Sequence, residues 1–159
     1  MFLNKKKIIL VISISSLIFF LILNQVRSQE LKVVDGDTIH LNSEKIRFTG
    51  IDTPELKQTC IKEGVINSCG LTAKEILIEK IADNKVECIS EGKDRYKRTL
   101  AECFVNDESL SSYLVRSGYA FAYRRYSKKF VKDEDYAKKI QAGMWSMKFN
   151  FPWDYRRNN

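Results

Sequence analysis

The stretch LKVVDGDTIHLNSEKIRFTGIDTPE, residues 31–55, decides the fold class. It contains three runs with strand-type patterns: Leu31–Val34, Thr38–Leu41 and Lys45–Ile51. The last of these alternates apolar and other residues, as a strand with one buried face does. Asp35-Gly36 is a turn signal between the first two runs, and Thr53-Pro54 fixes an extended residue before a rigid turn. The stretch therefore predicts the first strands of a sheet joined by tight turns.

The rest of the chain alternates helical and strand patterns. Apolar residues at helical spacing predict a helix from about Gly70 to Ala82, whereas Leu56–Cys69 has no period and predicts an irregular loop. Further predicted elements are two hairpin strands, a short helix ended by a glycine, a short strand and a third helix: Lys85–Ser90, Thr99–Val105, Asp107–Arg116 with Gly118, Tyr119–Tyr123, and Asp133 to Gly143. Five strands and about three helices predict an α+β domain, with an OB-fold five-stranded β-barrel as the architecture.

The first 28 residues form a separate segment. Lys5, Lys6 and Lys7 precede nineteen uncharged residues, from Ile8 to Val26. This layout is typical of a secretory signal peptide, and the run is also long enough for an uncleaved membrane anchor. Both alternatives leave residues 29–159 exported, because the lysines stay in the cytoplasm. We expect a domain that is secreted, periplasmic, or membrane-anchored outside the cytoplasm.

The charge of the exported domain is small. The chain carries +7, but residues 1–28 contribute four basic and no acidic side chains, which leaves +3 for residues 29–159. Bulk charge of this size does not by itself predict nucleic-acid binding. Any such function must rest on where the charges lie.

The exported part contains four cysteines. In an oxidising compartment an even number favours disulfides. Around the predicted turn at Asp94–Lys97, Cys88 and Cys103 fall directly opposite each other across the hairpin, and Cys60 and Cys69 flank a short polar loop that a second bridge would close. Four buried reduced thiols are the alternative. A zinc site is disfavoured, because the sequence has no Cys-x-x-Cys and one histidine, His40.

Six polar side chains carry the chemistry that the sequence suggests. They lie in VVDGDTIHL, IRFTGIDTPE and GKDRYKRTLAECF: Asp37, Arg47, Asp52, Thr53, Glu55 and Arg98. Oxygen ligands select a hard cation such as Ca²⁺, so the two aspartates and the Thr53 carbonyl are candidate metal ligands. Glu55 is placed to orient or deprotonate a water, and the two arginines suit a phosphate. In isolation each residue is better explained as a turn or surface residue, and it is their combination that predicts phosphodiester chemistry.

The same three segments strongly resemble the staphylococcal nuclease (thermonuclease) family. The resemblance extends from about Leu31 to Trp145 and includes SSYLVRSGYA and the closing GMW, while the cysteines and the tail FPWDYRR resemble an exported bacterial branch. It implies an OB-type barrel and a Ca²⁺-dependent endonuclease that cuts DNA and/or RNA at the 5′ oxygen and leaves a 3′-phosphate. By position it implies calcium ligands at Asp37, Asp52 and Thr53, a base at Glu55 and phosphate-binding arginines at Arg47 and Arg98.

Two departures from the family pattern bear on substrate contacts. Lys97 replaces the usual glycine of the D-x-Y-G-R turn, and Arg124 stands where a stacking aromatic is expected. Tyr96 and Tyr126 are further candidates for substrate contacts. The expected partners are nucleic acid and, through an uncleaved residue 1–28 segment, a membrane, and we expect a monomer. The alternative function is a non-catalytic OB module that binds single-stranded nucleic acid.

Overall fold

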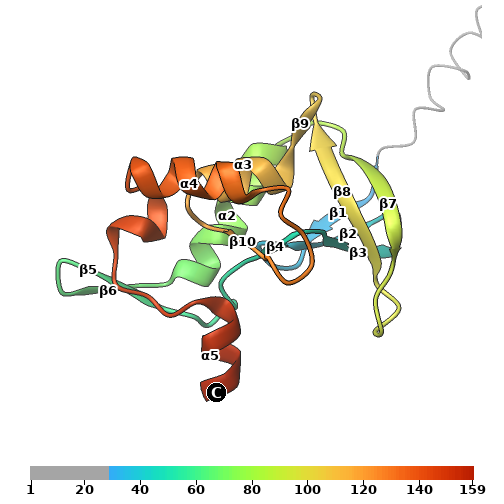
Figure 1. The fold of residues 1–159 in the computed structure, drawn as a ribbon. Helices are drawn as coiled ribbons and strands as arrows, with labels where there is room; N and C mark the ends of the chain where they lie inside the picture. The colour runs from blue at the N-terminus through green and yellow to red at the C-terminus, as the bar shows by residue number, and fades with distance from the viewer. Residues whose placement is uncertain (1–28) are drawn as a thin grey trace, which may run out of the picture.

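The computed structural model describes residues 29–159, and the predicted signal or anchor segment, 1–28, lies outside the described residues (Figure 1). The body is a twisted sheet with strand order β1-β2-β3-β8-β7, and β9 pairs with the end of β8. Its strands are β1 (Leu31–Val33), β2 (Thr38–Leu41), β3 (Glu44–Phe48), β7 (Glu87–Lys93), β8 (Thr99–Val105) and β9 (Glu108–Ser109). All pairs are antiparallel except β3 with β8. This confirms the predicted α+β class with an OB-type sheet, in which β9 adds a short sixth strand to the five predicted.

The inner face of the sheet builds the main core. Alternate strand residues such as Ile46, Phe48, Ala101 and Cys103 are buried, as a period of two requires when one face is covered. Helices cover this face: α2 (Cys69–Ile81), α3 (Leu110–Arg116) and α4 (Val131–Lys139). Figure 1 shows these three helices grouped on one side of the sheet. The core therefore leaves the strand ends and their turns free to carry polar side chains.

A second apolar cluster holds the C-terminal part of the chain. Phe121, in β10 (Phe121–Ala122), is its centre, with ring centroids 5.2–5.3 Å from those of Trp145, Phe149 and Phe151. The chain reaches this cluster through the 3₁₀ helix η1 (Gly143–Ser146) and ends in α5 (Pro152–Asn158). Because β10 pairs with β4 (Ile51–Asp52), the cluster brings the tail close to the turn after β4.

Several elements differ from the sequence prediction. The run Lys45–Ile51, predicted as one strand, is divided at Gly50 (φ 71°) into β3 and β4, and the helix predicted to start at Asp107 begins only at Leu110, after β9. The segment 56–69, predicted to be an irregular loop, contains a hairpin of β5 (Cys60–Lys62) and β6 (Val65–Asn67). Its apolar residues Ile61, Val65 and Ile66 are exposed, so burial imposed no alternation in the sequence. The tail forms a helix, α5, that begins at Pro152, where a missing N–H costs nothing. Finally, α4 begins at Val131, two residues before the acidic run that was predicted to start it.

No helix within residues 29–159 has both the length and the apolar character needed to cross a bilayer.

Candidate functional site

Arg47 joins two buried carboxylates, one from the turn before β2 and one from β4, which pairs with β10. It lies on β3 opposite Thr38 of β2, so that its side chain is beside Asp37, which directly precedes β2. Arg47 Nη1 donates to Asp37 Oδ1 at 2.8 Å, and Nη2 donates to Asp52 Oδ1 at 3.1 Å. Asp37 is 2% and Asp52 0% exposed. The structure thus brings together three residues that the sequence singled out, from positions up to fifteen residues apart.

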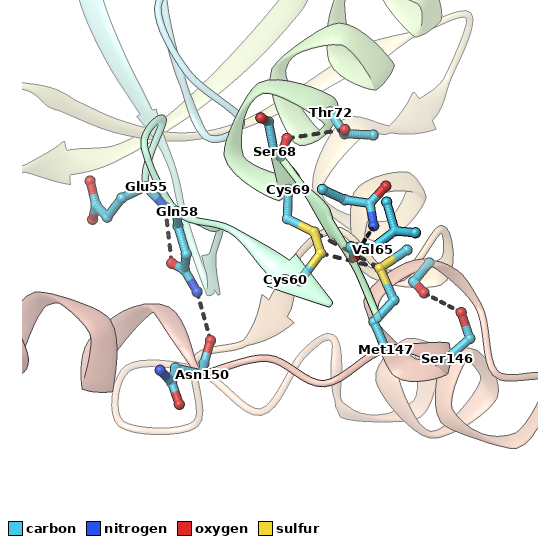
Figure 2. The surroundings of a disulfide bond; sticks show 12 residues. Glu55, Gln58, Cys60, Val65, Ser68, Cys69, Thr72, Ser146, Met147 and Asn150 are labelled. Carbon is cyan, nitrogen blue, oxygen red and sulfur yellow. Dashed lines mark hydrogen bonds between the residues drawn. A yellow bond between two sulfur atoms is a disulfide. The ribbon is translucent and has the colours of Figure 1, made fainter. Parts of the chain in front are cut away.

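Glu55 is held beside this pair by its backbone. Its N–H donates to Gln58 Oε1 at 3.2 Å, and Gln58 Nε2 donates to the Asn150 carbonyl at 2.6 Å, as Figure 2 shows. The backbone of Glu55 also packs directly against Gly70, at the start of α2. No side chain fits between them, because a Cβ at Gly70 would overlap the Glu55 carbonyl oxygen and lie 2.6 Å from its carbonyl carbon. The Glu55 side chain is 43% exposed, so this carboxylate faces solvent while the two aspartates do not.

Arg156 is a member of the site that the sequence analysis missed. It projects from α5, donates from Nη2 to Asp52 Oδ2 at 2.7 Å and from Nη1 to Asp52 Oδ1 at 3.2 Å, and reaches Glu55 Oε1 with Nη1 at 2.7 Å. The contact spans 104 residues of sequence from Asp52. Arg156 and Arg157 are adjacent arginines at the end of an aromatic tail, and nothing local distinguishes the one that enters the site.

Burial and neighbouring charges have opposite effects on the pKa values of Asp37 and Arg156. Burial raises the pKa of Asp37 to about 7, against the lowering effect of Arg47. Asp37 Oδ1 accepts from Arg47 and from the Thr38 hydroxyl, whereas no hydrogen bond from residues 29–159 reaches Oδ2. Burial acts to lower the pKa of the Arg156 guanidinium, but its hydrogen bonds to Asp52 and Glu55 outweigh this and raise it. Asp37 Oδ2 is therefore open to a proton or a cation.

Arg98 is placed apart from these acids. Its guanidinium pairs with Asp94 of the same hairpin turn, with Nη2–Oδ2 and Nε–Oδ2 distances of 2.7 Å. Within residues 29–159 no hydrogen bond or ion pair joins Arg98 to Asp37, Asp52 or Glu55. Lys97, which replaces the usual glycine of this turn, adopts the left-handed conformation at φ 65°, so the turn keeps its shape without the glycine.

The residues near the predicted substrate contacts form an arginine-rich pocket. Its volume is about 650 Å³ and it lies between the end of β10 and α5, lined by Ala122, Tyr123, Arg124, Arg125, Trp153, Arg156 and Arg157. Tyr123 stacks on Trp153 with centroids 5.8 Å apart. Tyr126 does not line the pocket but packs edge-on against Tyr123, and both it and Tyr96 are exposed. Arg124, at the position where an aromatic was expected, pairs with the buried Glu134 at 2.6 Å.

The four cysteines form the two predicted bridges. Cys88 and Cys103 are directly paired across β7 and β8, with Cα atoms 4.0 Å apart, and they are joined as a disulfide. Cys60 at the start of β5 is bonded to Cys69 at the start of α2, which closes the loop beyond Glu55 (Figure 2). No cysteine in the described part of the chain is free. Two bridges in so small a domain fit an oxidising compartment.

The acids suit a hard cation with few protein ligands. Within residues 29–159 no group of three or more His, Cys, Asp and Glu side chains converges as a metal cage would. Arg47 bridges the two aspartate carboxylates, and these alone are too few ligands for a cation. The coordination would be completed by water, by a backbone carbonyl such as that of Thr53, and by a substrate phosphate. Arg156 already places a positive charge on Asp52 and Glu55. The donor set is thus all oxygen, which fits Ca²⁺ or Mg²⁺ and not zinc.

Fold and site together define a small OB-type domain with an arginine-bridged carboxylate pair and a third, solvent-facing carboxylate beside it. Residues 45–147 match the family model described as Staphylococcal nuclease homologue, and the chain belongs to the staphylococcal nuclease family. The predicted resemblance is thereby confirmed. Asp37, to the N-terminal side, and Arg156, to the C-terminal side, both lie outside the matched range.

Similar proteins include several named as nucleases. An uncharacterized endonuclease of Haemophilus influenzae is 29% identical over 73% of this chain and 64% of its own length. The thermonuclease of Staphylococcus hyicus is 29% identical, over 77% of this chain and 78% of its own. Endonuclease YhcR of Bacillus subtilis is 32% identical over 79% of this chain, which spans 12% of that protein. This chain thus spans less than two thirds of the length of the Haemophilus protein and of the Bacillus protein.

Proposed function

We propose that this protein is an endonuclease that hydrolyses phosphodiester bonds of DNA and/or RNA with Ca²⁺, cuts the bond to the 5′ oxygen and leaves a 3′-phosphate. The observation that carries the proposal is the bridge of Arg47 between Asp37 and Asp52, with Glu55 linked to Asp52 through the shared Arg156. Family membership supports the proposal, since relatives are named as endonuclease and thermonuclease. The two disulfides support an exported domain, residues 29–159.

The cation belongs at the aspartate pair. The cation would be held by three protein groups: the open Oδ2 of Asp37, the carboxylate of Asp52, and the Thr53 carbonyl. Water and phosphate would occupy the remaining coordination positions. When bound there, Ca²⁺ supplies positive charge to the phosphoryl oxygens as charge builds on them. We assign no further protein ligand.

The other residues act on the phosphate and on water. Arg47, locked between two aspartates, presents a fixed guanidinium that can contact a phosphoryl oxygen without having to be ordered first. The half-exposed Glu55 carboxylate can accept a hydrogen bond from the attacking water and orient it. Arg98 pairs with Asp94 through Nε and Nη2, which leaves the N–H groups of Nη1 to serve as the second phosphate contact.

The test is cleavage of single-stranded DNA and of RNA by the purified protein in Ca²⁺, in Mg²⁺ and in EGTA, with the termini of the products identified. The proposal expects cleavage in Ca²⁺ that EGTA abolishes, with 3′-phosphate ends. Salt-sensitive binding without hydrolysis would identify the protein instead as a non-catalytic single-strand-binding module. Cleavage that survives EGTA would contradict the metal part of the proposal.

A further inference from the structure

The tail helix places a cation on the carboxylates that the proposed Ca²⁺ would use. Asp52 is fully buried and both of its oxygens accept from Arg156, at 3.2 Å and 2.7 Å. Nη1 of the same guanidinium also donates to Glu55 Oε1 at 2.7 Å. A planar guanidinium bound to both oxygens of one carboxylate is among the strongest ion-pair geometries that proteins use. Asp52 Oδ2 cannot ligate a metal along the direction that Arg156 Nη2 occupies.

Arg156 can withdraw without unfolding the tail, because other contacts hold the tail in place. Phe151 and Trp153 stack with centroids 4.6 Å apart, and Phe151 packs against Phe121. The segment before α5 is joined to β5 by the hydrogen bonds Ile61 N to Lys148 O and Lys148 N to Ile61 O, and to Gln58 through the Asn150 carbonyl (Figure 2). None of these contacts uses Arg156.

The space beside Arg156 also allows a second position for the side chain, in a pocket where Arg124 and Arg157 are already paired with Glu134 and Asp154. Arg156 is 39% exposed and lines the 650 Å³ pocket beside Tyr123 and Trp153, so its side chain borders open space as well as Asp52. A rotation about the side-chain torsions moves it into that pocket while α5 stays fixed. The helix thus supplies a tethered charge with two accessible places, one on the acids and one beside them.

We propose that Arg156 is an active-site residue that acts as the resident counter-ion of Asp52 and Glu55, so that a divalent cation and this guanidinium compete for the same carboxylates. The inference rests on the proposed function, because it takes Asp52 as a ligand of the cation. It adds that the C-terminal helix sets the cation concentration at which the site fills. Arg156 lies beyond the residues that match the family model.

The test is the equilibrium affinity for Ca²⁺, measured by titration calorimetry at pH 8 without nucleic acid, for the wild type, Arg156→Gln and Arg157→Gln. Arg157 is the matched control, because it lies on the same helix and carries the same charge, but pairs with Asp154 on the surface. Arg156→Gln should bind Ca²⁺ roughly tenfold more tightly or better, the order expected when a charged, hydrogen-bonded competitor is removed. Arg157→Gln should stay within about twofold, as exposed charges interact weakly.

A third variant and a second readout guard against misfolding. Arg156→Lys keeps the charge but cannot bond both oxygens of Asp52, so its affinity should fall between the wild type and Arg156→Gln. The rise in melting temperature on adding Ca²⁺ should follow the same order, because a ligand that binds only the folded state stabilises it according to its affinity.

The outcomes separate this inference from the proposed function. If the wild type cuts DNA with Ca²⁺ but Arg156→Gln binds Ca²⁺ no more tightly than Arg157→Gln, Arg156 is a tail anchor and the inference is wrong while the nuclease stands. If neither the wild type nor Arg156→Gln binds Ca²⁺, the cation site and the inference both fail. If Arg156→Gln binds Ca²⁺ more tightly than the wild type but the wild type does not cleave DNA, the competition is supported and the nuclease is contradicted.

Discussion

Arg47→Lys perturbs the centre of the site while keeping its charge. In the folded protein Arg47 makes two directed contacts, 2.8 Å to Asp37 Oδ1 and 3.1 Å to Asp52 Oδ1, and its side chain is 22% exposed. A lysine ammonium is a compact point charge on a single stem, and it cannot span both carboxylates as the guanidinium fork does. One buried aspartate would lose its partner, and the phosphate would lose a fixed donor.

The size of the effect follows from those two losses. A charged hydrogen bond contributes about 1.5–3 kcal/mol to stability, so losing one should lower the free energy of unfolding by about 2 kcal/mol. Loss of one preorganised donor to a developing oxyanion costs about 10²–10³ in rate. We therefore expect Arg47→Lys to fold, to unfold at lower urea, and to cleave single-stranded DNA at least about a hundredfold more slowly than the wild type.

The assay compares initial cleavage rates at saturating Ca²⁺ with urea unfolding of the same preparations. Arg116→Lys is the control, because Arg116 makes one partly exposed ion pair with Asp133 on the helical side of the domain, at 3.3 Å. It should leave both the rate and the unfolding midpoint almost unchanged. An Arg47→Lys protein that cleaves within about threefold of the wild type would refute the assignment of Arg47 as the fixed phosphate donor.

Three further predictions follow from the same geometry. Gly70→Ala should slow cleavage by about a hundredfold, because its Cβ would overlap the carbonyl oxygen of Glu55, lie 2.6 Å from the carbonyl carbon and push that residue by about an ångström. Gly64→Ala, at φ 82° with nothing within 4 Å, should cost stability through its backbone strain but leave the cleavage rate of the folded protein unchanged, and equal rates for the two folded variants would contradict the role of Glu55. Lys97→Gly should raise the free energy of unfolding by about 0.5–1 kcal/mol, since glycine adopts φ 65° without strain, and urea denaturation would disprove this if the midpoint fell. Ca²⁺ affinity measured by calorimetry should increase as pH rises from 5.5 through about 7 and level about one pH unit above that, because a cation binds the ionised form of Asp37, whose pKa burial raises to about 7. An affinity independent of pH across this range would show that Asp37 is not a ligand.

Local patterns determined most of the fold. The strands 38–41 and 99–105 are observed with the predicted bounds, and the opposition of Cys88 and Cys103 follows from counting residues around one turn. The β5–β6 hairpin was missed because its apolar residues are exposed and the two-residue turn at Glu63-Gly64, rather than burial, defines it. Periodicity detects strands only where a core selects one face.

The site divides in the same way. Asp37 and Arg47 meet through the local pairing of β2 with β3, and Asp52 follows Arg47 by only five residues, so their meeting was predictable from sequence neighbours. The pairing of β4 with the distant β10, which holds Asp52 in place, was not. Arg98 was predicted to share a phosphate with Arg47, and the structure places its guanidinium on Asp94. Arg156 reaches Asp52 only through the packing of aromatic residues around Phe121, a tertiary contact that no local pattern encodes.

The most direct test of the whole account is the rate of single-stranded DNA cleavage as a function of free Ca²⁺ at pH 8. We expect a rate that rises from background in EGTA, saturates with Ca²⁺ and falls again when EGTA is added back. A rate that stays the same with and without Ca²⁺, or no cleavage at any Ca²⁺ concentration, would contradict a cation site built on Asp37 and Asp52.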